Sequence, residues 1–186
     1  IPESGYDLPQ TRAYLYSQLA LLGADEVKPC DEGIRVVFRA NAPVKDAIAL
    51  RADMDALCIP EETEHDFRSE HPGMMHACGH DGHMAAMLMV ARIVAGRRSE
   101  LDRDVVLLFQ PAEESLGGAK RMIDAGARDN PRVGEVYGMH IMPSLPLGTI
   151  GCRTGAMMAA VDTWEIEIAG RAAHGATPQL GCDAIM

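Results

Sequence analysis

Two apolar segments most restrict the fold that this chain can adopt. Residues 47–53 and 104–110 each contain a run of apolar side chains with little polar alternation, which is typical of strands buried on both faces. Segments with the helical spacing of apolar residues separate and follow them. Strands that alternate with helices predict an α/β fold with a doubly wound, mostly parallel sheet.

The same periodicities predict the other elements. Near residue 155 the pattern changes from buried strands and helices to a strand that alternates between polar and apolar residues. Residues 161–169 alternate sharply, which is typical of a half-exposed antiparallel strand. We therefore expect an α/β domain over residues 1–157 and the start of a second, α+β domain over residues 158–186. The remaining strands are expected at 33–39, 135–140 and 148–152, and helices at 9–22, 84–96 and 117–125.

The composition argues against two classes of partner. The formal net charge is −10 and aromatic residues make up 4% of the chain, so no basic face is expected for nucleic acid or an anionic membrane. The longest apolar run, residues 84–91, is too short to span a bilayer. We therefore expect a soluble protein with no nucleic-acid and no membrane partner.

The cysteines indicate the compartment. Five cysteines are scattered without a C-x-x-C pair, which argues against a disulfide framework and against a structural zinc knuckle. A reducing, cytoplasmic compartment is the expectation. The first residues, IPES, contain neither an initiating Met nor a signal pattern, and we expect both ends of the chain to be cut.

The densest group of reactive side chains lies in residues 75–83, MHACGHDGH. Cys78 and His80 are two positions apart, so Gly79 must lie in a turn or an extended segment for them to converge. The N-terminus of the following helix would favour a thiolate at Cys78. A thiolate with an imidazole suits Zn, Mn, Co or Ni better than Mg or Ca. Taken by itself, such a pair is more often a buried cysteine beside a helix-capping histidine, without a metal.

Further ligand-type residues stand at the ends of predicted strands, where open α/β sheets bind their ligands. Of two adjacent carboxylates, one can ligate a metal while the other serves as a base. Each group also has a structural explanation of its own: a solvated acidic loop, a hydrogen-bonded histidine or a turn-capping aspartate. Their recurrence at successive strand ends favours a metal site. The residues are Glu113 with Glu114, His140, and Asp53 with Asp55.

Six motifs follow one another along the chain: RADMDAL (51–57), MHACGHD (75–81), QPAEE (110–114), GGA (117–119), GMH (138–140) and GRAAH (170–174). Together they resemble the metal-dependent amidohydrolase and carboxypeptidase family. That family includes hippurate hydrolases, N-acyl-L-amino-acid amidohydrolases, auxin-conjugate hydrolases and aminobenzoyl-glutamate hydrolases. The resemblance implies a di-zinc exopeptidase-like catalytic domain, with residues 158–186 as the beginning of an inserted lid or dimerisation domain.

The resemblance also implies roles for single residues. The site would hold two divalent metal ions, of Zn, Mn, Co or Ni, and the family's last ligating histidine follows the lid, beyond the end of this chain. Asp55 would orient a ligand imidazole. Glu113 is similar to the catalytic base, and His174 to a lid histidine that stabilises the oxyanion or holds the substrate. The metal ligands by motif position are Cys78, His80, Glu114 and His140.

The implied reaction is hydrolysis of the amide bond of an N-acyl amino acid or a small peptide by a metal-activated water, with a homodimer through the lid as a possible assembly. Two alternatives stay open. One is a thiol hydrolase with Cys78 as nucleophile and His80 or His140 as its base. The other is a truncated or inactive metal-binding homologue. We expect His65, His71 and His83 to be surface, loop or first-turn residues outside the site.

Overall fold

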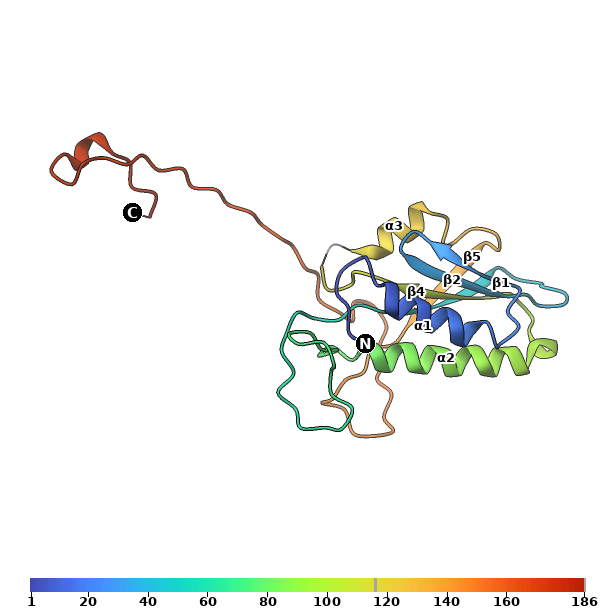
Figure 1. The fold of residues 1–186 in the computed structure, drawn as a ribbon. Helices are drawn as coiled ribbons and strands as arrows, with labels where there is room; N and C mark the ends of the chain where they lie inside the picture. Colours follow the sequence, from blue (N-terminus) through green and yellow to red (C-terminus); the bar gives the residue numbers. More distant parts are fainter. Residues whose placement is uncertain (116, 186) are drawn as a thin grey trace. The chain divides into compact units, whose positions relative to one another are not determined.

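The computed structural model describes residues 1–115 and 117–185 and divides into two compact units, Ile1–Pro143 and Ser144–Met186. The first unit holds a five-stranded sheet with the order β1-β2-β4-β3-β5 (Figure 1). Its strands are β1 (Glu26–Cys30), β2 (Gly33–Phe38), β3 (Ala47–Asp53), β4 (Val105–Gln110) and β5 (Val133–Gly138). Its helices are α1 (Pro9–Leu19), α2 (His80–Gly96), the 3-10 turn η1 (Arg98–Glu100) and α3 (Gly118–Asp124).

The sheet is mixed, so the prediction of a mostly parallel sheet is wrong. Strand β3 pairs in parallel with β4 and β5, but β2 is antiparallel to both β1 and β4. A two-residue turn at Asp31 and Glu32 joins β1 to β2, and so short a connection can only join antiparallel strands. The sequence reasoning missed β1, which contains Lys28 and Pro29 and lacks an apolar run.

Helices cover both faces of the sheet, as a doubly wound α/β fold requires. Helices α1 and α2 pack on one face over a core that includes Phe38, Leu107 and Phe109, and α3 lies on the other face, where its Met122 joins a core cluster with Val106 (Figure 1). Both β2 and β4 are buried along their whole length. The long apolar strands therefore lie in the middle of the sheet. No helix among the described residues is long and apolar enough to cross a membrane.

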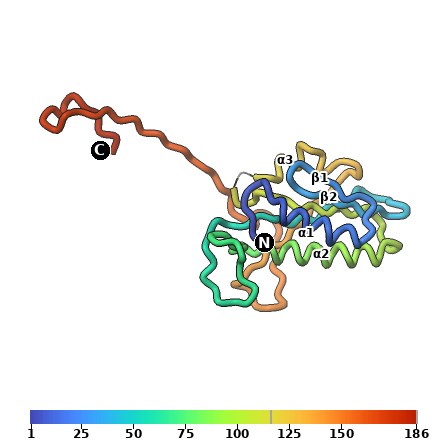
Figure 2. Tube along the Cα trace, in the orientation of Figure 1, coloured from blue at the N-terminus to red at the C-terminus, as the bar shows by residue number. Residues whose placement is uncertain are grey.

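The parallel strands bring the predicted ligand residues to one edge. Asp53, the last residue of β3, pairs with Gln110, the last residue of β4, and Arg51 pairs with Gly138 at the end of β5. Every loop that leaves these strands therefore starts from the same edge. The connection from β3 to α2, residues 54–79, starts there (Figure 2).

The second unit contains neither of the two strands predicted between residues 144 and 185. Residues 148–152 and 161–169 form no strand, and its described regular elements are the 3-10 turn η2 (Pro178–Leu180) and one bridge between Arg171 and Cys182. A strand needs a hydrogen-bonded neighbour, and no described segment pairs with residues 161–169. Trp164 is 84% exposed. A lid is therefore not evident in this chain, and the division at residues 157 and 158 stays a prediction.

Arg35 provides a test of the sheet's α3 face. Its side chain is 1% exposed, pairs with Glu26 and donates hydrogen bonds to the backbone carbonyls of residues 127, 129 and 130. Replacing Arg35 by Met leaves these carbonyls and the carboxylate without their partner, so we expect the free energy of unfolding to fall by about 3–5 kcal/mol. Urea unfolding measures this loss. Lys120→Met, which removes an exposed ion pair with Asp124, should leave the midpoint unchanged.

Candidate metal centre

Gly79 joins the Cys/His segment to α2 in the way that the spacing predicts. It is the N-cap of α2 and has a φ of 83°, a left-handed conformation that favours glycine. Because the chain turns there, Cys78 and His80 both reach the edge where the parallel strands end. The Cys78 Sγ lies 3.3 Å from the Nε2 of His140, which follows β5. The predicted convergence of Cys78 and His80 is confirmed.

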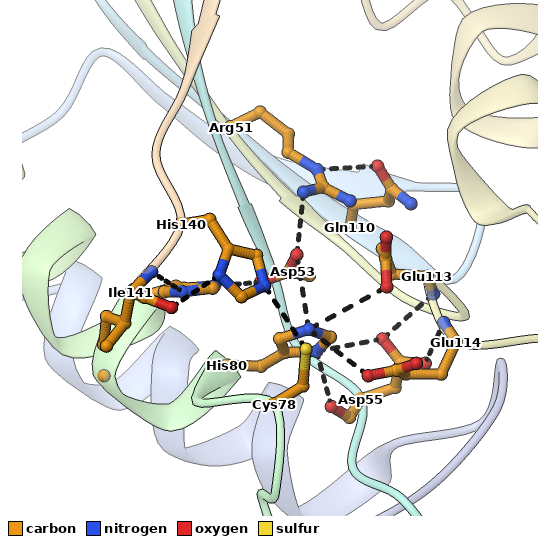
Figure 3. A network of polar contacts seen from close by, with 12 residues as sticks. Arg51, Asp53, Asp55, Cys78, His80, Gln110, Glu113, Glu114, His140 and Ile141 are labelled. Atoms are coloured by element: carbon orange, nitrogen blue, oxygen red, sulfur yellow. Dashed lines mark hydrogen bonds and ion pairs between the residues drawn. The ribbon is translucent and has the colours of Figure 1, made fainter. Parts of the chain in front are cut away.

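His80 lies at the centre of the site and is 1% exposed. Its Nδ1 donates to the backbone carbonyl of Asp55 at 2.8 Å, so the neutral ring carries its lone pair on Nε2. That buried nitrogen has no hydrogen-bond partner among the described residues. Carboxylate oxygens of Asp53, Glu113 and Glu114 lie 3.5, 3.9 and 3.8 Å from it (Figure 3). A lone pair that faces three carboxylates is stabilised by a cation or a proton between them.

Three groups of side chains have the spacing of a metal site, with potential ligand atoms that lie within 4.8 Å of one another in each group. His80 belongs to all three. Sulfur, imidazole nitrogen and carboxylate oxygen form a donor set that suits borderline divalent ions, so the residues present fit the metals that the sequence predicts. The groups are Cys78 with His80 and His140, Asp53 with His80 and His83, and His80 with Glu113 and Glu114.

Asp55 connects the two strand-end groups. Its carboxylate oxygens accept the backbone N–H groups of Glu113 and Glu114 at 3.0 and 3.1 Å. Burial alone would raise the pKa of Asp55, but the nearby His80 ring, with Nδ1 3.6 Å from Oδ1, and the hydrogen bonds from these two backbone groups lower it below its usual value. Asp55 is therefore a buried carboxylate that holds both glutamates and, through its backbone carbonyl, the ring of His80.

Comparison with known proteins assigns the chain to a family, because the peptidase family M20/M25/M40 matches residues 49–183. The chain belongs to this family. It is 40% identical over 186 residues to the N-acyl-L-amino acid amidohydrolase of Geobacillus stearothermophilus, covering 99% of this chain and 50% of that protein. It is 38% identical over 187 residues to the IAA-amino acid hydrolase ILR1-like 5 of Arabidopsis thaliana, covering 100% of this chain and 42% of that protein.

A solved structure agrees with this assignment. The YXEP protein of Bacillus subtilis, a dinuclear metal binding peptidase of the M20 family, matches with a TM-score of 0.77 and 37% identity, over 82% of this chain and 42% of that chain. The chain spans about half the length of the curated relatives that it matches. In the YXEP protein, the matched region is 42% of that chain.

Asp55→Asn is expected to weaken the hydrogen bonds that hold the M20 site together without creating a cavity. The amide is isosteric but has one acceptor oxygen, so its NH2 group would face the backbone N–H of Glu113 or Glu114. We expect the free energy of unfolding to fall by about 1.5–3 kcal/mol and metal affinity to fall about 10–100-fold. Urea unfolding and metal competition titration measure the two effects. Asp66→Asn, in the exposed loop, is the control, and equal behaviour of the two variants would contradict this role for Asp55.

The surroundings of Cys78 do not favour a thiolate by themselves. Burial, followed by the carboxylates of Glu114, Glu113 and Asp53, raises the pKa of the Cys78 thiol to about 12. The expectation of a thiolate at Cys78 is therefore wrong for these side chains alone, because burial and the three nearby carboxylates all favour the neutral thiol. A metal held at Cys78 in this M20 chain has to displace the thiol proton.

His83 is the site residue that sequence reasoning missed. It lies in the first turn of α2, which is one of the places predicted for it. It is 1% exposed, however, and its two ring nitrogens contact Asp53 and the backbone of Ile141, so the expectation that it lies outside the site is wrong. His65 and His71 do lie in a loop, the connection between β3 and α2, as predicted. A signal was present, since residues three apart share a helix face and His80 is the first residue of α2.

His174 lies in the second unit of the M20 chain. Its Nδ1 accepts the backbone N–H of Ala176 at 3.1 Å, and its carbonyl accepts the backbone N–H of Thr177 at 2.8 Å. These contacts form a local turn before η2. The role of His174 toward an oxyanion or a substrate stays a prediction.

Proposed function

We propose that the whole protein is a metal-dependent amidohydrolase that cleaves the amide bond of N-acyl amino acids or small peptides. One observation carries the proposal: the buried Nε2 of His80 points its lone pair at three carboxylates and belongs to three groups with metal-ligand spacing. Relatives named as an N-acyl-L-amino acid amidohydrolase and an IAA-amino acid hydrolase support the substrate class.

Cys78, His80, Glu114 and His140 would hold the two divalent ions, with Zn, Mn, Co and Ni as the candidates for this donor set. When bound, such ions polarise the scissile carbonyl and acidify the attacking water. The protein's own contribution is to hold these side chains at one edge of a rigid sheet. The thiol and imidazole come from the turn before α2 and from the end of β5, and the carboxylate comes from the loop after β4.

Glu113 is the proposed general base. Its side chain is 40% exposed, so a substrate water can reach it, and its Oε2 lies 3.9 Å from the Nε2 of His80. Asp55 fixes its backbone. The Glu113 carboxylate takes a proton from the attacking water and returns it to the leaving amine. His174, carried by the second unit, would donate a hydrogen bond to the tetrahedral oxyanion.

The assembly and the compartment complete the proposal. The exposed apolar side chains of Val161, Trp164 and Ile166 in the second unit provide a surface for a homodimer. Scattered free cysteines without a disulfide among the described residues are consistent with a cytoplasmic location.

A thiol hydrolase is the second candidate, and the 3.3 Å contact of Cys78 Sγ with His140 Nε2 favours it. The chemistry of the pair opposes it, because burial and then the nearby carboxylates raise the pKa of Cys78 to about 12, whereas a nucleophilic cysteine needs a lowered pKa. A thiol mechanism also leaves the two glutamates without a function. The metal mechanism uses all of these residues.

The experiment is a hydrolysis screen of the whole protein loaded with Zn, Mn, Co or Ni. The substrates are N-acetyl, N-benzoyl and indole-acyl amino acids and dipeptides. We expect turnover of at least one substrate, its loss in EDTA and its return when metal is added. Activity that survives EDTA but not iodoacetamide would support the thiol mechanism. Failure on every amide, with two ions bound, would support an inactive metal-binding homologue.

A further inference from the structure

We propose that His83 is a positioning residue of the metal centre, which sets the orientation and the tautomer of His140 through the backbone of Ile141. The proposal rests on the proposed function in one respect: His140 is taken as a metal ligand. His83 itself is not a ligand here, although it belongs to a group with metal-ligand spacing.

The hydrogen bonds of His83 use both of its ring nitrogens. Nδ1 lies 2.6 Å from Oδ1 of Asp53, and a carboxylate only accepts, so Nδ1 carries the proton. Nε2 therefore holds the lone pair, and it accepts the backbone N–H of Ile141 at 2.9 Å. Both contacts are those of a ring that is 1% exposed. No lone pair of this imidazole is left for a cation.

The Ile141 backbone passes this constraint to His140. The Nδ1 of His140 lies 2.7 Å from the carbonyl oxygen of Ile141, so Nδ1 donates and Nε2 keeps its lone pair. That Nε2 is the atom 3.3 Å from the Sγ of Cys78 (Figure 3). One residue thus uses its N–H to bind His83 and its carbonyl to fix the ring of His140.

The part of the chain around His140 is exposed to solvent. His140 is exposed and Ile141 is 44% exposed, so burial alone does not fix the loop after β5. The Ile141 side chain does lie against the first turn of α2, where a Cβ at Gly82 would come 2.5 Å from its Cδ1. Gly82 leaves the space that this contact needs. The described contacts of this loop with α2 and the turn before it are the packing of Ile141, the hydrogen bond to His83, and the contacts of the His140 ring with His83 and Cys78.

Asp53, the other hydrogen-bond partner of His83, is held in place by residues of the sheet. Asp53 is 1% exposed, and its second oxygen accepts a hydrogen bond from Arg51 at 2.7 Å. The Nε of Arg51 donates to the side chain of Gln110 at 2.8 Å. Arg51 and Asp53 lie on β3 and Gln110 on β4, so the Asp53 carboxylate that orients His83 cannot turn easily (Figure 3).

Two substitutions separate the two hydrogen bonds of His83. Asn can still donate to Asp53 but is too short to reach Ile141, whereas Gln can place an oxygen near the position of Nε2 and accept the Ile141 N–H. The whole protein is loaded with Co²⁺, and metal content, affinity by competition and the visible spectrum are measured for His83→Asn and His83→Gln. His65→Asn, at an exposed loop position, is the control.

We expect His83→Asn to weaken the ion at Cys78 and His140 about 10–100-fold and to change the thiolate-to-cobalt absorption, with His83→Gln closer to the wild type. Unchanged affinity and spectrum in His83→Asn would overturn the proposal. So would complete loss of one ion in both variants, because that result would make His83 a ligand. Metal binding by the wild-type protein tests the proposed function separately.

A second measurement does not depend on metal. In ¹⁵N-edited imidazole spectra of the wild-type protein, His83 and His140 should both be Nδ1–H tautomers, and in His83→Asn the His140 ring should become a mixture. An Nε2–H tautomer at His83 would overturn the proposal even if the protein bound no metal and the proposed function failed.

Discussion

Replacing Glu113 by Gln is expected to lower amide turnover by the whole protein about 10²–10⁴-fold while both metal ions stay bound. The amide fills the same space but cannot take a proton from water. The Glu113 backbone bond to Asp55 does not involve the side chain, so the loop after β4 should keep its position. Steady-state hydrolysis and metal analysis of the same sample measure the two quantities.

The Glu114→Gln variant is the matched comparison for Glu113→Gln. Glu114 is the adjacent carboxylate, and its backbone N–H also donates to Asp55. As a proposed ligand, Glu114 should lose metal affinity when it is replaced, and excess metal should restore part of the activity. Glu113→Gln should not respond to excess metal. If the two variants exchanged these behaviours, the roles of base and ligand would be reversed.

Replacing His80 by Asn is expected to have the largest effect on metal binding, lowering affinity by at least about 10²-fold, which is the upper range for residues that only support a ligand. His80 belongs to all three candidate groups, so its loss affects every arrangement of ions that they allow. Calorimetric titration with Zn²⁺ and Mn²⁺ measures the change. The free energy of unfolding should also fall, because the carbonyl of Asp55 loses its donor.

His140→Asn separates the ions. His140 belongs to one group, with Cys78 and His80, so its replacement should lower the affinity for one ion and leave the affinity for the other unchanged.

The prediction for His80 would be contradicted by a His80→Asn protein that retained two tightly bound ions. That result would show that the carboxylates hold both metals without the central imidazole.

Much of the fold could be predicted from local patterns. The strands predicted at 47–53 and 104–110 are β3 and β4, which lie inside the sheet, with β4 buried along its whole length and β3 in part. Strand β1 could not be found in this way, since Lys28 and Pro29 interrupt its pattern and its place at the sheet edge tolerates both. Residues 161–169 have the alternation of a strand but no described partner, and alternation alone does not form one.

The candidate site divides in the same way. Residue types were enough to predict that Cys78, His80, Glu113, Glu114 and His140 come together, since the glutamates and His140 follow parallel strands that end at one edge of the sheet. They were not enough to find His83. Its partners Asp53 and Ile141 lie 30 and 58 residues away in sequence, and only the packing of α2 against β3 brings them together.

The sequence by itself determined which residues can carry chemistry and where the chain turns to present them, because the left-handed turn at Gly79 and the strand ends depend on neighbours a few positions away. The tertiary structure decided the pairing direction of β2, the burial of His83 and the set of carboxylates that faces His80. These depend on contacts between segments distant in sequence, which set the local dielectric, the hydrogen-bond partners and therefore the protonation of each site residue.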